Sequence, residues 1–177
     1  GIQISSGLNT IGGNNSIDRN YISGNLQNGI LLSSASATNN FISKNYIGIN
    51  GSGTVAAANS QNGIKIDEWV SGTQINGNTI AANAQSGVYI ANTSTGTTVY
   101  GNGIGVGADL GALGNGSHGV EAYGTVKIGT ANIDSNRNII GSNVGNGILI
   151  SGTGASNSTI EFNEIQPILD DEKIIMN

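Results

Sequence analysis

The chain has 177 residues, of which 10% are charged and 37% hydrophobic, with 29 glycines, one proline and no cysteine. A net charge of −5 is too small for disorder through charge repulsion, and six scattered basic residues against 11 acidic ones exclude a nucleic-acid footprint. No disulfide framework is available, and no apolar run reaches the 18 or so residues that span a bilayer, so membrane insertion is not expected. The length predicts one domain.

A strand-like signature, glycine followed by alternating apolar residues, recurs six times in chain order. Its copies are Gly1–Ile4, Gly29–Leu32, Gly63–Ile66, Gly87–Ile90, Gly119–Ala122 and Gly147–Ile150. Between this signature and the next lies one further apolar position. It is occupied by Ile11, Ile42, Ile75, Val99, then Ile128 or Ile133, and Ile160.

An Asn-x-Ile signature closes each period, so that every period holds three short strands. Its asparagines are Asn20, Asn45, Asn78, Asn102, Asn138 and Asn163. Asparagine tolerates a left-handed backbone, and stacked side-chain amides can hydrogen-bond from one repeat to the next. The sequence therefore predicts that these six asparagines form a structural ladder.

The spacing of the signatures indicates a coil with insertions at one corner. The step from each glycine to its asparagine is 15 to 19 residues, whereas the step from asparagine to the next glycine alternates between 9 and 17 or 18. Insertions confined to one corner are typical of solenoids. We expect the two long corner loops, residues 48–62 and 105–118, to enter the face of the first strands and to rim a shallow groove.

Strands of two or three residues cannot stabilise isolated hairpins, because each contributes only one or two inward side chains. Stacking coils about 4.8 Å apart solves this, since the backbone then pairs between coils and the aliphatic side chains form columns. The sequence predicts an all-β protein: a parallel β-helix of about six coils over residues 1–166. Residues 167–177, which mix charged and apolar side chains, are expected to be a tail that acts as a cap or a subunit contact.

Three segments, Asn9–Gly13, Arg19–Asn25 and Asn45–Gly48, resemble repeats of bacterial right-handed parallel β-helix proteins of the pectate-lyase-like superfamily. The resemblance implies a right-handed solenoid and an extracellular or cell-surface location. The same fold serves polysaccharide lyases and hydrolases, phage tailspikes, adhesins and secreted repeat proteins, so it does not choose among functions.

The outward position of the first strand carries the candidate site. In coil order it reads Gln3, Leu31, Lys65, Tyr89, Glu121 and Leu149, and its polar centre is flanked in the following turns by Asp67, Glu68, Trp69 and Tyr123. Sugar rings stack on aromatic faces and their hydroxyls bind carboxylates, so Lys65, Asp67, Glu68, Trp69, Tyr89, Glu121 and Tyr123 are the candidate ligand-binding residues. Two interpretations stay open: a sugar-binding groove, or an ordinary exposed face with a few large side chains.

The residues offer little support for catalysis. The resemblance implies that a lyase would hold Ca²⁺ with a carboxylate cluster beside a basic residue, but Asp67 and Glu68 are the only adjacent carboxylate pair near Lys65 and no arginine is close. Ser117-His118-Gly119 weakly resembles the Gly-His-Gly motif of the polygalacturonase-like hydrolases. We assign no catalytic residue and no metal, expect no cofactor unless Ca²⁺ serves a carbohydrate-active form, and interpret His118 as a loop-end histidine facing solvent.

The function expected from these features is a non-catalytic extracellular scaffold that contacts polysaccharide or neighbouring subunits. The alternatives are a carbohydrate-active β-helix, either lyase or hydrolase, and a fibre subunit that stacks head to tail. Because Gly1 opens directly on a core strand, the first coil is expected to be covered by flanking coils or by another copy in an end-to-end homo-oligomer.

Overall fold

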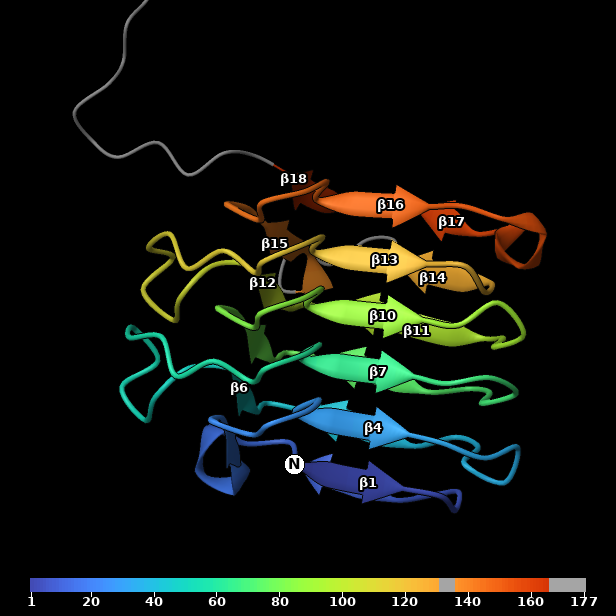
Figure 1. Cartoon of the computed structure of the whole chain (residues 1–177), viewed down its shortest axis with the longest axis horizontal. Coiled ribbons are helices and arrows are strands. Elements are labelled where there is room, and N and C mark those ends of the chain that lie inside the picture. The colour runs from blue at the N-terminus through green and yellow to red at the C-terminus, as the bar shows by residue number, and fades with distance from the viewer. Residues whose placement is uncertain (131–135, 166–177) are drawn as a thin grey trace, which may run out of the picture.

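The computed structural model describes residues 1–130 and 136–165, which form a parallel β-helix of six coils with three strands each (Figure 1). Sheet A contains β1 (Ile2–Ile4), β4 (Ile30–Leu32), β7 (Ile64–Ile66), β10 (Val88–Ile90), β13 (Val120–Ala122) and β16 (Ile148–Ile150). Sheet B contains β2 (Thr10–Gly12), β5 (Phe41–Ser43), β8 (Gln74–Asn76), β11 (Thr97–Tyr100), β14 (Val126–Ile128) and β17 (Thr159–Ile160). Sheet C contains β3 (Tyr21–Ile22), β6 (Tyr46–Ile47), β9 (Thr79–Ile80), β12 (Gly103–Ile104), β15 (Asn138–Ile140) and β18 (Asn163–Ile165).

The expected all-β solenoid with three strands per coil is confirmed. Every strand pairs in parallel with the corresponding strand of an adjacent coil, and two single-turn 3₁₀ helices, Ser16–Asp18 and Thr153–Ala155, lie in the turns between strands. In the fifth coil, Ile128 occupies the apolar position between the glycine signature and the Asn-x-Ile signature, and it is fully buried. Its alternative, Ile133, and the expected tail at 167–177 lie outside the described residues.

The core consists of aliphatic columns that run along the helix axis. On sheet A, for example, Ile30 pairs with Ile64 and Ile64 with Val88, and all three side chains are fully buried. Each coil thus covers the apolar side chains of its neighbours, which a strand of three residues cannot do alone.

The six asparagines of the Asn-x-Ile signature form one continuous ladder at the corner between sheets B and C. Each side-chain Nδ2 donates to the Oδ1 of the asparagine in the next coil, at 2.7 to 3.1 Å from Asn20 through to Asn163. The Nδ2 of Asn78 also donates to the Ile42 carbonyl at 2.9 Å, and its Oδ1 accepts the Asn45 backbone N–H at 2.9 Å. The ladder therefore satisfies buried backbone groups as well as its own amides.

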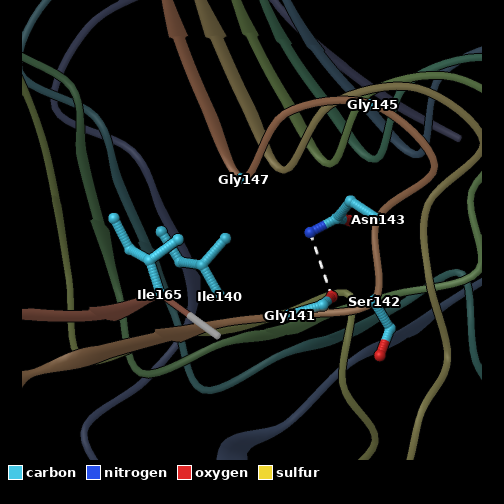
Figure 2. A pocket seen from close by; sticks show the side chains of 7 residues that line it. All are labelled: Ile140, Gly141, Ser142, Asn143, Gly145, Gly147 and Ile165. Carbon is cyan, nitrogen blue, oxygen red and sulfur yellow. Dashed lines mark hydrogen bonds between the residues drawn. The ribbon is translucent and has the colours of Figure 1, made fainter. Parts of the chain in front are cut away.

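A second asparagine ladder, which our sequence analysis missed, runs along the corner between sheets C and A. It contains Asn25, Asn59, Asn83, Asn115 and Asn143, with Nδ2–Oδ1 distances of 2.7 to 3.0 Å between neighbours. Each member lies four residues before the glycine that opens the next first strand, so a constant spacing was available as a signal. Asn143, the last described member, donates to the Gly141 carbonyl at 3.1 Å and borders a hollow of about 330 Å³ at the last described coil (Figure 2).

Loss of one internal rung should destabilise the whole stack. We expect Asn78→Ala to lower the free energy of unfolding by about 3 kcal/mol, because it strands buried donors and acceptors in two coils. Urea unfolding followed by circular dichroism measures this. Asn14→Ala, at an exposed asparagine, is the matched control and should change stability by less than about 0.5 kcal/mol; equal effects from the two variants would contradict the role given to the ladder.

Candidate functional site

The polar centre of sheet A is built by strict register between three coils. Lys65 of β7 pairs with Tyr89 of β10, and Tyr89 pairs with Glu121 of β13, so their outward side chains stand one above another. They line a hollow of about 510 Å³ together with residues that precede the strands: Gln61, Asn62, Gln85 and Ser117. Three of the seven candidate residues therefore share one groove.

Glu121 is held in place by two hydroxyl groups. The Ser86 Oγ donates to one carboxylate oxygen at 2.5 Å, and the Tyr123 Oη donates to the other at 3.1 Å. The Tyr123 ring also lies against Tyr89, with 5.8 Å between ring centroids and a tilt of 48°. These contacts join Tyr89, Glu121 and Tyr123 into one rigid cluster.

Lys65 is the cation of this face. Its Nζ lies 3.6 Å from the Asp67 carboxylate and 5.9 Å from the centroid of the Tyr89 ring. Both side chains of the ion pair are about one third exposed, so the pair contributes little to stability but orients the ammonium group over the strand.

Glu68 and Trp69 lie in the turn after β7, at the opposite end of the strand from the groove. The Glu68 carboxylate accepts hydrogen bonds from the backbone N–H and the hydroxyl of Thr93. The backbone N–H of Trp69 donates to that same hydroxyl at 3.0 Å. Trp69 is 66% exposed and has a φ of 67°, a left-handed conformation that is unusual for a bulky residue. The fold thus keeps a large aromatic side chain exposed to solvent, although its backbone conformation is energetically unfavourable.

The two tyrosines of the cluster are harder to ionise than a free tyrosine. Burial raises the pKa of Tyr89, and the charges of Glu121, Glu68 and Asp67 raise it further. The hydrogen bond to Glu121 raises the pKa of Tyr123, with smaller contributions from the Glu121 charge, from burial and from Tyr89. Both phenols therefore remain hydrogen-bond donors at neutral pH.

The long corner loops border this groove as expected, but only with their ends, through Gln61, Asn62 and Ser117. Their tips turn toward the face of sheet C, where Gly53 lies against Tyr46 and Ala108 lines a second hollow. The tips also touch each other, since the Ala108 N–H donates to the Gly53 carbonyl at 2.8 Å across the intervening coil. Both loops leave the same corner of the helix, which puts them in reach of each other (Figure 1).

His118 is not a free loop-end histidine. It occupies the position before the strand glycine that other coils give to Asn28, Asn62, Ser86 and Asn146. From the second of these coils on, the backbone N–H at this position donates to the side chain at the same position in the preceding coil. The His118 Nδ1 accepts the Asn146 N–H at 2.9 Å. His118 therefore substitutes for asparagine as an acceptor in a polar row.

Three parallel sheets, each with one strand from every stacked coil, and internal asparagine ladders define a parallel β-helix of the pectate-lyase-like fold, as the sequence resemblance implied. A family model described as NosD, periplasmic copper-binding protein, matches residues 3–106, which is more than half of the chain, and the chain belongs to this family. No curated protein and no solved structure gives a significant match.

The family description places such proteins outside the cytoplasm, in agreement with the expected extracellular or cell-surface location. None of the described residues forms a helix with the length and apolar character that a membrane crossing requires.

The link between Glu121 and the two phenols can be tested by titration. We expect Glu121→Gln to lower the pKa of Tyr123, and to a smaller extent that of Tyr89, because it removes the carboxylate charge and the ionic acceptor. Because the folded-state values are raised, this cluster contributes stability below the ordinary tyrosine pKa of about 10, and the contribution is lost as pH rises through the folded-state values. NMR of ¹³C-labelled tyrosine between about pH 9 and 12 gives the site-resolved values.

The control for this titration is Glu161→Gln, which removes a carboxylate paired with Lys127 on sheet B. It should leave both tyrosine titrations unchanged. A Tyr123 titration that is the same in wild type and Glu121→Gln would refute the assigned contact.

Proposed function

We propose that this chain is a non-catalytic β-helix scaffold outside the cytoplasm that binds polysaccharide along the outward face of sheet A. The observation that carries the proposal is Trp69, which is held exposed and in a left-handed conformation in the turn after β7, beyond the end of the strand that contributes Lys65 to the row. Neither core packing nor local backbone preference accounts for a tryptophan in this position, and strained exposed residues concentrate at functional sites. An aromatic platform next to hydrogen-bonding groups suits a sugar ring.

The groove at the other end of these strands offers regularly spaced polar groups on the same face. The Oε1 atoms of Gln61 and Gln85 accept hydrogen bonds from the Asn28 and Asn62 side chains at 2.9 and 3.1 Å. These contacts orient the glutamine amides, one coil apart, on the wall of the groove that contains Tyr89. A chain of sugars laid across the strands, along the helix axis, would meet a repeated set of donors and acceptors.

The state of the carboxylates supports a binding role over hydrolysis or elimination. Each oxygen of Glu121 already accepts a hydroxyl hydrogen bond, Asp67 pairs with Lys65, and Glu68 binds Thr93. Glycoside hydrolysis needs one carboxyl group that donates a proton and a second that acts on the opposite side of the bond. In this arrangement all three carboxylates of the face serve as acceptors for groups of the protein itself.

The copper binding named in the family description does not fit the residues of this chain. Copper sites in proteins are built mainly from cysteine, histidine and methionine, and this chain has no cysteine, one histidine and one methionine. The histidine uses Nδ1 within the polar row, and no group of three metal-ligating side chains occurs in residues 1–130 and 136–165. We therefore include no metal in the proposed function.

The partner at the ends of the stack is proposed to be further β-helix, either flanking coils or a second copy. Within the described residues, the strands of the first and last coils pair on one side only. Parallel strands with a free edge accept another strand in the same register.

Polysaccharide binding can be tested by affinity electrophoresis against a panel of neutral and acidic polysaccharides. We expect retardation on at least one polymer, with Trp69→Ala and Tyr89→Ala each weakening binding about tenfold, because each removes a stacking surface. Tyr100→Ala on sheet B is the matched control and should bind as wild type. Release of unsaturated or reducing-end products, with or without Ca²⁺, would show that the face is catalytic, and unchanged binding by both variants would place the site elsewhere.

The copper mismatch predicts that the chain forms no stoichiometric copper complex at micromolar metal concentrations. Competition with a chromogenic chelator, run separately with Cu(I) and Cu(II), measures this, and wild type should compete no better than His118→Asn. A one-to-one complex that disappears in His118→Asn would overturn our assignment of His118 to the polar row alone.

A further inference from the structure

The outward face of sheet C contains a second hollow, of about 500 Å³, that lies under the tip of the loop at 105–113. Its floor is formed by the outward positions of four coils, Thr79, Gly103, Ile139 and Glu164, and by the corner residues beside them, which include Arg137. Its roof is formed by the loop tip with Leu110. This hollow is separate from the groove on sheet A.

The hollow exists because β12 carries glycine at its outward position. Gly103 pairs with Thr79 below and Ile139 above, so its position in the row is fixed by register. A Cβ placed on Gly103 would have one close neighbour, the Cγ2 atom of Val106 at 3.1 Å, and the next nearest atom would be 3.9 Å away. A larger side chain at this position would therefore extend into open space beneath the loop.

The same row shows what fills this space two coils earlier. Tyr46, in register with Thr79 and through it with Gly103, is 9% exposed because the loop at 48–57 covers it. A Cβ on Gly53 of that loop would lie 2.7 Å from the Tyr46 ring, and the Arg19 guanidinium lies 3.8 Å from the ring centroid. Loop, ring and guanidinium form one packed unit.

The second loop repeats the construction of the first. Each begins at a glycine with positive φ, Gly48 at 85° and Gly105 at 79°, and each closes through an antiparallel bridge, Ile49 with Ala56 and Val106 with Ala112. Arg137 precedes the Asn-x-Ile asparagine of its coil as Arg19 does, and lines the hollow. It belongs to the coil after Gly103, however, whereas Arg19 belongs to the coil before Tyr46. The row carries no ring at Gly103.

The roof is rigid and apolar at its rim. The Gly107 N–H bonds the Gly111 carbonyl at 2.8 Å, and the Ala108 N–H ties the tip to Gly53. Leu110 is 51% exposed with a φ of 66°, so an aliphatic side chain is held at the mouth in a conformation that leucine rarely adopts. A preformed cavity with an apolar rim binds without first having to order itself.

We infer that this hollow is a binding site for an aromatic ring, and that its ligand is a tyrosine side chain from an extended polypeptide segment. The Tyr46 unit is the template: a loop that closes through a similar antiparallel bridge, and an arginine from an adjacent coil, surround a tyrosine ring at the same position in the row. A guanidinium beside the ring favours an aromatic face over an aliphatic side chain or a sugar.

The experiment is an NMR titration of the full chain with N-acetyl-tyrosine methylamide. Shifts are expected at the amides of Gly103 and Leu110, with half-saturation on the order of 1 mM for a ligand of this size. N-acetyl-leucine methylamide and a methyl glucoside are the competing probes and should bind at least tenfold more weakly.

Gly103→Tyr should abolish the titration, because the protein then supplies the ring itself, and should raise the melting temperature. Gly103→Ala is the matched control that keeps most of the space and should retain binding. Leu110→Asn, which suits a left-handed backbone, tests the rim without filling the site and should weaken binding severalfold. The inference is overturned by an absence of shifts at Gly103 and Leu110, by equal binding of the glucoside, or by unchanged binding in both Gly103→Tyr and Leu110→Asn.

Discussion

Each coil of this β-helix depends on hydrogen bonds to the coils above and below, because its strands are too short to form a core alone. Backbone pairing at the coil spacing places each inward isoleucine over the next, and two asparagine ladders close the corners where backbone groups would otherwise be buried without partners. The stability of the stack therefore depends little on the outward side chains. These positions can vary, and so can carry a binding surface, without loss of the fold.

The two candidate surfaces arise from opposite departures from a plain row. On sheet A, large polar and aromatic side chains stand in register, and Ser86 and Tyr123 lock Glu121 between them. On sheet C, a glycine interrupts a row that carries tyrosines in the first two coils, and an inserted loop roofs the gap. The first surface offers an exposed platform, the second a preformed cavity, which suit a polymer and a single ring respectively.

Membership of the NosD family accounts for the fold and the location but not for a metal site. A metal centre needs ligands of suitable chemistry brought together, and this chain has neither cysteine nor a second histidine. His118 shows how the stack uses its single imidazole: as an acceptor that continues a row of asparagine and serine side chains.

The sequence alone determined the coils, their three strands, the first asparagine ladder and the Lys65–Tyr89–Glu121 row, because one-to-one stacking turns a repeat period directly into spatial neighbours. It also held the signal for the second ladder, at four residues before each strand glycine, but insertions in alternate coils hid that spacing when it was counted from the Asn-x-Ile signature. Tertiary structure alone decided where the loop tips pack, which hydroxyls hold Glu121 and what Gly103 leaves open. These features depend on contacts between side chains or inserted loops in different coils, about which a repeat pattern carries no information.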